Sequence, residues 1–226
     1  MMIKPIFITS TGTNIGKTHL TKLIIKRCKE LNLYIDAIKP IISGYENKNI
    51  YSTDTGIILK SLNKKNKDIN KISPWRFNAP LSPDIAAKLI NQEIDLNDVK
   101  EFCIKRIKTL PNKNGIFIIE GVGGTMTPIN KKYTIINLIK IIKIPIILVT
   151  GSYLGSISHT LNCLYNLSKY KINVKSIVIS ESKESNVGVD ITKNSLINHI
   201  NSIPIYKLKR NSINKNEIID KIIDYL

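Results

Sequence analysis

The chain has 226 residues, of which 42% are hydrophobic, and a formal net charge of +17 at pH 7. This length suits one α/β domain, residues 1–226, with a sizeable core. No apolar run approaches the roughly 18 residues that cross a bilayer, and the first residues lead into a strand without a secretory signal, so we expect no membrane span. The three cysteines are widely spaced, which favours buried thiols in a reducing cytoplasm over a metal site.

The positive charge raises the question of nucleic-acid binding, because a basic surface attracts phosphate backbones. Lysines are spread along the whole chain, however, and one Trp and four Phe provide no aromatic platform for bases. We therefore do not expect a nucleic-acid partner. The charge could still raise association rates with small anionic substrates.

Six short runs rich in Ile and Val predict strands that are buried on both faces of a sheet, because their apolar residues are nearly continuous. They are residues 6–9, 34–38, 116–119, 144–149, 175–180 and 203–206. Helical patterns lie at about 16–30, 53–61, 83–91, 95–108, 134–142, 156–169, 190–200 and 215–225. The polar stretch 62–72 indicates an exposed loop. The alternation predicts a single-domain α/β fold with a mostly parallel sheet flanked by helices.

The first predicted strand runs through a turn of small residues into Gly16-Lys17-Thr18 and a helical pattern. A strand, a tight loop and a helix N-terminus form an anion cradle, since backbone N–H groups and the helix dipole attract phosphate. Lys17 would reach the terminal phosphates, and Thr18 would offer its hydroxyl to Mg²⁺. The usual pattern has glycine five residues before Gly16, where this chain has Thr11. We therefore expect a variant loop of the phosphate-loop NTPase type.

Two more strand ends carry charged residues, and ligands of such sheets bind beyond the carboxyl ends of the strands. Lys39 follows the second strand, as a phosphate contact or as an ordinary turn lysine. Asp54 lies where a helix begins, which by itself favours a capping carboxylate over a metal ligand. Glu120 ends the third strand before a glycine-rich turn. In phosphate-loop proteins a carboxylate in that position holds Mg²⁺ or its water.

Together these motifs resemble dethiobiotin synthetases over about residues 6–180. The resemblance is carried by Thr-Gly-Thr-x-Ile-Gly-Lys-Thr at 11–18, Lys39-Pro40 with Ser43-Gly44, Asp54, Ser82-Pro83, Glu120-Gly-Val-Gly-Gly with Pro128, Ile144-Pro145-Ile-Ile-Leu-Val, and Leu154-Gly155-Ser-Ile157-Ser-His159. The phosphate loop and the glutamate motif are shared with related ATPases. The Lys-Pro and Leu-Gly segments narrow the choice among these ATPase families.

The resemblance implies a cytoplasmic, homodimeric ligase of biotin biosynthesis that uses ATP and Mg²⁺. Its substrate would be 7,8-diaminononanoate, one amine of which takes up CO₂ as a carbamate. ATP would phosphorylate the carbamate, and the second amine would then close the cyclic urea of dethiobiotin. Such a site has to hold two anions in line and neutralise charge as it moves.

The same resemblance implies roles for individual residues. Lys39 would be the main catalytic residue, together with Lys17. The protein share of the Mg²⁺ shell would be Thr18, Asp54 and Glu120.

Ser43 would bind the diamine side of the substrate, and Thr13 would lie near the carbamate. Gly155, in the segment 151–159, would help a partner subunit to bind the substrate's carboxylate tail. The implied nucleotide-binding residues are Thr13, Asn14, Ile15, Gly16, Lys17, Thr18, His19, Asp54, Glu120, Gly121, Val122, Gly123 and Ser180.

The chain departs from the family pattern in its loops. Ser10 stands where the family usually has glycine, and Gly12 stands where it usually has an acidic residue. Ser180 replaces an asparagine that commonly reads the adenine edge, which leaves base selectivity open.

Two alternatives remain at this point. A phosphate-loop ATPase of the partition or cobyrinate-synthase class would share two motifs, but the loop lacks the early lysine of partition ATPases and 226 residues leave no room for a glutamine-hydrolysing domain. A non-catalytic nucleotide-binding module would explain the missing acidic loop residue. It would not explain the joint presence of both lysines and all three oxygen ligands.

Overall fold

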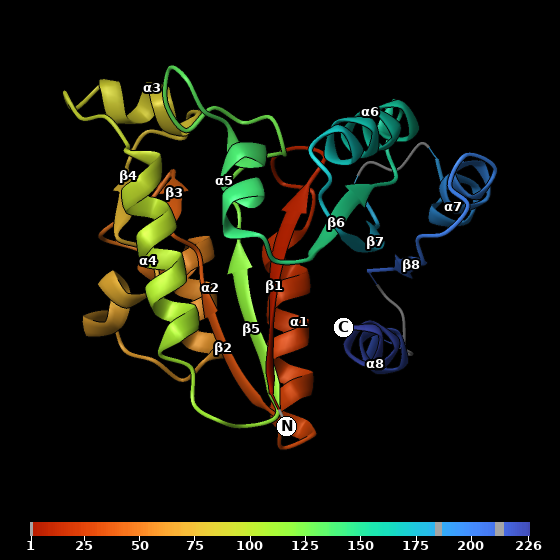
Figure 1. The fold of residues 1–226 in the computed structure, drawn as a ribbon, viewed down its shortest axis with the longest axis horizontal. Coiled ribbons are helices and arrows are strands. Elements are labelled where there is room, and N and C mark those ends of the chain that lie inside the picture. The colour runs from red at the N-terminus through yellow and green to blue at the C-terminus, as the bar shows by residue number, and fades with distance from the viewer. Residues whose placement is uncertain (1, 184–186, 211–214) are drawn as a thin grey trace.

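The computed structural model describes residues 2–183, 187–210 and 215–226 (Figure 1). Its centre is a six-stranded sheet in the order β2-β5-β1-β6-β7-β8, in which all neighbouring strands run parallel. The strands are β1 (Ile3–Ser10), β2 (Tyr34–Ile38), β5 (Gly115–Glu120), β6 (Ile146–Gly151), β7 (Val174–Ser180) and β8 (Ile205–Leu208). The predicted α/β fold with a mostly parallel sheet is confirmed, and all six predicted strands are present.

A second, two-stranded parallel sheet pairs β3 (Ile41–Ser43) with β4 (Trp75–Phe77), and it was not predicted. Strands of three residues are too short to show a periodic pattern. The expected exposed loop at 62–72 is partly wrong, because Asn66–Lys71 forms a 3-10 helix and Ile72 is fully buried. The carbonyl of Ile72 accepts a hydrogen bond from the backbone N–H of Lys39, so this stretch helps to hold the end of β2.

Eight α-helices occur in the described residues, one for each predicted helical pattern. They are α1 (Lys17–Glu30), α2 (Asp54–Ser61), α3 (Pro83–Lys88), α4 (Leu96–Lys108), α5 (Ile135–Ile142), α6 (Ser156–Lys169), α7 (Val189–Ile197) and α8 (Lys215–Tyr225). Helices α3 and α7 each end three residues earlier than predicted. In α3 the reason is a turn in which Asn91 adopts a positive φ of 54°, which a helix cannot continue.

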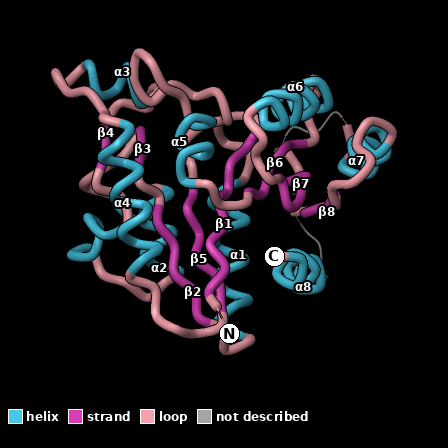
Figure 2. Tube along the Cα trace, in the orientation of Figure 1, coloured by secondary structure: helices cyan, strands magenta, loops and turns pink. Residues whose placement is uncertain are grey.

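The helices cover both faces of the large sheet (Figures 1 and 2). Buried residues of α1, α2 and α8 pack on one face, and those of α3 to α7 pack on the other. Successive side chains of β1 point to opposite faces of the sheet. Ile6 and Ile8 pack in the core with α1, α2 and α8, and Phe7 packs in the core with α3 to α7. This two-sided burial is why the strands are apolar without alternation. No helix in the described part of the chain is both long and apolar enough to cross a membrane.

Strand register brings three strand ends together. Ile38 at the end of β2 pairs with Ile119 of β5, and Ile8 of β1 pairs with Glu120. The carboxyl ends of β2, β5 and β1 therefore lie side by side. Lys39, Glu120 and the loop that follows β1 emerge at this one edge.

Candidate active site

The loop between β1 and α1 ends at Gly16, which has a φ of 103° and caps α1 without a side-chain hydrogen bond. A Cβ atom on Gly16 would stand 2.4 Å from the Oγ of Ser180, so the backbone conformation favours glycine and any larger residue would force Ser180 to move. Ser180 therefore lies against the loop, at the end of β7. The first turn of α1 is left without a side-chain cap, which suits an anionic ligand.

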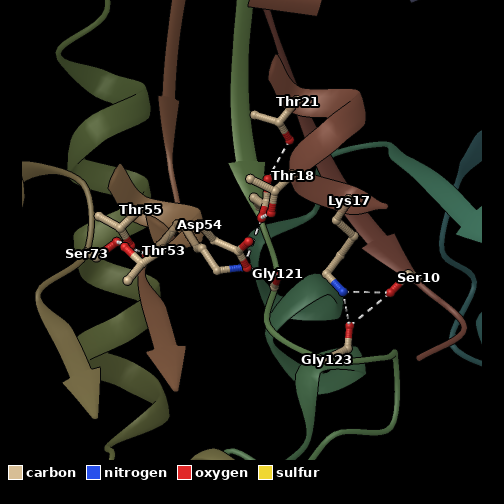
Figure 3. Close-up of polar contacts among 12 residues, drawn as sticks. Ser10, Lys17, Thr18, Thr21, Thr53, Asp54, Thr55, Ser73, Gly121 and Gly123 are labelled. Carbon is tan, nitrogen blue, oxygen red and sulfur yellow. Dashed lines mark hydrogen bonds and ion pairs between the residues drawn. The ribbon is translucent and has the colours of Figure 1, made fainter. Parts of the chain in front are cut away.

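Lys17 points back into the loop (Figure 3). Its Nζ donates to Ser10 Oγ at 2.8 Å, to the Gly123 carbonyl at 2.7 Å and to the Gly12 carbonyl at 3.2 Å. Burial, and after it the positive charge of Lys39, lower the pKa of Lys17 to about 8. The site thus holds two lysines close enough to affect each other.

Lys39 lies between two carboxylates. Its Nζ is 2.9 Å from Glu120 Oε1 and 3.1 Å from Asp54 Oδ2, and its side chain is only 2% exposed. Burial alone would lower the pKa of Lys39, but the two carboxylates outweigh it and leave that pKa raised. Burial likewise opposes ionisation of Asp54, yet the charge of Lys39 holds the pKa of Asp54 below its usual value. Lys39 is therefore no ordinary turn lysine; it is a buried cation.

Glu120 accepts hydrogen bonds from two threonines on α1. Thr18 donates to its Oε1 and Thr21 to its Oε2, each at 2.6 Å, and the glutamate is fully buried. Sequence reasoning missed Thr21. The signal was available, because residues three apart on a helix share a face and Thr18 had already been placed at the site.

The favoured capping role of Asp54 is wrong. The N-cap of α2 is Thr53, whose extended backbone (φ −85°, ψ 157°) lets its side chain accept from the N–H of Gly56 at 3.2 Å. Asp54 is the first helical residue, and its Oδ2 atom lies 3.1 Å from the Nζ atom of Lys39.

A cleft of about 1120 Å³ opens above these strand ends. Many predicted residues line it: Thr13, Asn14, Ile15, Gly16, Lys17, Thr18, His19, Lys39, Ser43, Asp54, Val122 and Gly123. Glu120, Gly121 and Ser180 are not in the lining, although Glu120 contacts Thr18 and Lys39 and Ser180 packs against Gly16. Lining residues that sequence reasoning missed are Lys22, Ile42, Ser52, Thr53, Ile57, Pro80, Leu81, Thr127 and Lys183. Lys22 lies one turn beyond Thr18 on α1, so helical spacing could have found it.

Gly155 is not brought to the cleft. It caps α6 with a φ of 93°, is exposed, and is absent from the cleft lining. Its implied role is toward a partner subunit, so this position in one chain does not test it and the role stays a prediction.

Three oxygen-bearing side chains at this edge would fit a magnesium ion. The described residues hold no cluster of three or more His, Cys, Asp or Glu side chains. The hydroxyl of Thr18 and the carboxylates of Asp54 and Glu120 nevertheless converge, since both carboxylates contact Lys39 and Thr18 contacts Glu120. Mg²⁺ takes hard oxygen ligands and usually keeps several waters, so two carboxylates and a hydroxyl suffice.

A glycine-capped loop lies between β1 and α1, and a buried carboxylate, Glu120, ends β5, the neighbour of β1 in the sheet. This arrangement defines a phosphate-loop nucleotide-binding α/β protein. The AAA domain family matches residues 4–211. The ATP-dependent dethiobiotin synthetase of a Caulobacter species is 35% identical over 91% of this chain and 87% of its own length. That of Clostridium botulinum is 33% identical over 99% of this chain and 98% of its own. The chain belongs to the ATP-dependent dethiobiotin synthetase family, as its motifs predicted.

Solved structures of other phosphate-loop proteins share the fold. The cell division protein MinD of Aquifex aeolicus aligns with a TM-score of 0.52 at 14% identity. The alignment covers 96% of this chain and 87% of the MinD chain. A ParA family ATPase of Chlorobium tepidum aligns with a TM-score of 0.53 at 15% identity. The alignment covers 98% of this chain and 93% of the ParA family chain. At such identities the likeness concerns the fold alone.

Proposed function

We propose that this chain closes the cyclic urea of dethiobiotin from 7,8-diaminononanoate, CO₂ and ATP. The single observation that carries the proposal is the buried ammonium of Lys39, held between Asp54 and Glu120 beside the phosphate loop. A cation in that position suits a reaction in which two anions meet. Membership of the dethiobiotin synthetase family supports the same substrates.

In the proposed reaction one substrate amine adds to CO₂ and loses a proton, which gives a carbamate. A carbamate oxygen then attacks the γ-phosphorus of ATP, and ADP leaves. The second amine attacks the carbonyl carbon of this mixed anhydride, and phosphate leaves as the ring closes. Lys39 and Lys17 neutralise the carbamate and the transferring phosphoryl group, and Thr13 lies close to the carbamate. No covalent enzyme intermediate is required.

Thr18, Asp54 and Glu120 would hold Mg²⁺. When bound, the ion neutralises and orients the terminal phosphates. The residues of the chain then have two tasks: the loop from Thr13 to His19 binds the triphosphate, and Lys39 keeps the carbamate in line. Val122 and Gly123 line the cleft and would contact the nucleotide there, whereas Gly121 leaves room for the ring of Phe7.

The remaining walls of the cleft suit an aliphatic diamine. Ile42, Pro80 and Leu81 provide apolar surface next to Ser43. The Oγ of Ser43 is buried and has no hydrogen-bond partner among the described residues, so it is available to a substrate amine. We further propose a homodimer, in which the segment around Gly155 serves the partner's carboxylate subsite.

The test is an assay with diaminononanoate, bicarbonate, ATP and Mg²⁺ that follows the cyclic-urea product. We expect turnover by the wild-type chain and a loss of about 10³-fold in Lys39→Ala. Lys113→Ala, at an exposed loop position, is the matched control and should retain full activity. Circular dichroism must show that each variant is folded. A folded wild-type chain that yields no product would leave a non-catalytic nucleotide-binding module instead.

A further inference from the structure

The ammonium of Lys17 is held by three protein oxygens: Ser10 Oγ at 2.8 Å and the carbonyls of Gly123 at 2.7 Å and Gly12 at 3.2 Å. An ammonium group has three N–H donors, so every donor has an acceptor. Ser10 supplies the only side-chain acceptor that these contacts include.

Ser10 also joins two loops. Its hydroxyl lies 2.6 Å from the Gly12 carbonyl of the phosphate loop and 3.0 Å from the Gly123 carbonyl of the turn after β5. A hydroxyl has one hydrogen and donates to one of these carbonyls at a time, while its lone pairs accept from Lys17. The backbone of Ser10 reinforces the junction, because its carbonyl accepts from the N–H of Thr125 at 3.1 Å.

Burial makes this hydroxyl hard to replace. Ser10 is fully buried and does not line the cleft, so bulk water cannot take over its contact with Lys17. Lys17 and Gly123, by contrast, both line the cleft. The longest of the three contacts is the one to Gly12, and it is the one that a phosphate oxygen would replace at least cost. Ser10 and Gly123 would then keep the ammonium in place.

We infer that Ser10 is a positioning residue for nucleotide binding, which fixes the ammonium of Lys17 at the cleft through its hydroxyl. This inference rests on the proposed contact between Lys17 and the terminal phosphates of ATP. Ser10 does not line the cleft itself and would act through Lys17.

Isothermal titration calorimetry with ATP and Mg²⁺, without the diamine, tests the inference. Ser10→Ala should weaken ATP binding about tenfold, the effect of one lost charge-assisted hydrogen bond. Binding of AMP, which lacks the phosphates that Lys17 contacts, should stay within about twofold. A loss of packing alone would weaken both nucleotides equally, and tighter ATP binding would mean that Ser10 competes with the nucleotide for Lys17; either result overturns the inference.

A double-mutant cycle shows whether Ser10 acts through Lys17. Adding Ser10→Ala to Lys17→Ala should cause no further loss of ATP affinity, and an additive loss would overturn the inference. If Lys17→Ala alone binds ATP like the wild type, the proposed role of Lys17 fails and the inference about Ser10 fails with it. Ser176→Ala is the matched control, because Ser176 is a buried strand serine whose Oγ has no partner among the described residues. Should Ser10→Ala not fold, Ser10→Gly removes the same hydroxyl and enters the same cycle.

Discussion

Thr21 of α1 and Glu120 of β5 are joined by a 2.6 Å hydrogen bond, and both residues are fully buried. The bond occupies Oε2 of the glutamate, while Oε1 receives Thr18 and Lys39. The helix that follows the phosphate loop therefore sets the orientation of the carboxylate on the neighbouring strand. A displacement of α1 would therefore move Thr18 and Glu120 together, and both belong to the proposed metal site.

Thr21→Val tests the contribution of this bond. Valine keeps the shape of threonine but leaves a buried carboxylate oxygen without its donor. We expect the free energy of unfolding to fall by about 2 kcal/mol, within the range for an unsatisfied buried group. Urea denaturation measures the change. Thr21→Ser, which keeps the hydroxyl, should lose clearly less, and equal losses in the two variants would assign the effect to packing.

Lys39→Met tests the buried ion pair. Removing one partner of such a pair costs about 3–5 kcal/mol, because the other charge stays buried, although the half-exposed Asp54 can regain water. Lys39→Met combined with Glu120→Gln should lose less than the two single changes added together, by about 1 kcal/mol or more. The exposed pair between Lys221 and Glu217 is the control, and Lys221→Met should cost below about 1 kcal/mol. Additive losses would show that Lys39 and Glu120 are not coupled.

The sequence allowed prediction of which residues meet, because parallel strands end at one edge of a sheet. Lys39 follows β2 and Glu120 ends the neighbouring strand β5, so their convergence needed only the correct elements and connections. What each side chain contacts was harder to predict. Whether Asp54 caps its helix or pairs with Lys39 depends on the backbone angles of Thr53 and on the distance across two loops, and neither has a local pattern.

The short strands β3 and β4 and several loop residues of the cleft could not be predicted from the sequence either. The pairing of β3 with β4 joins residues more than thirty positions apart through strands of three residues. This pairing places Ile42, which was not predicted, beside the predicted Ser43 at the cleft wall. Leu81 and Lys183 reach the same cleft from separate loops, and such convergence follows from tertiary packing rather than from periodicity.

The core thiols give a prediction about pH. Burial raises the pKa of Cys103 from its ordinary value near 9 to about 12. Below pH 9 the thiol is protonated in both states and contributes fully to stability. Above pH 9 the unfolded chain ionises first, so this contribution falls as pH rises toward 12. The slope should be about 1.4 kcal/mol per pH unit for this thiol.

Cys103→Ala isolates the effect, because other groups also titrate in this range. Its unfolding free energy should decline less steeply between pH 9 and 11 than that of the wild type, whatever its absolute stability. Iodoacetamide at pH 8 provides a second measurement: the buried Cys28 and Cys103 should react only after denaturation. Parallel slopes in the two proteins, or rapid native alkylation of Cys103, would contradict the prediction.

Gly16→Ala tests the geometry of the phosphate loop. Alanine would have to adopt a φ of 103°, and its Cβ would stand 2.4 Å from Ser180 Oγ. Such strain costs about 1–3 kcal/mol, so we expect a lower melting temperature and ATP binding at least tenfold weaker. Calorimetric titration and thermal unfolding measure the two effects.

The double variant Gly16→Ala/Ser180→Gly separates the two causes. It removes the collision but keeps the unfavourable φ, so it should recover only part of the lost stability and affinity. Gly188→Ala is the control, because Gly188 has a φ of −60° and a Cβ atom there would meet no atom of the described residues within 4 Å, so alanine should be tolerated. Complete recovery in the double variant would mean that contact with Ser180, and not backbone conformation, requires glycine at the start of α1.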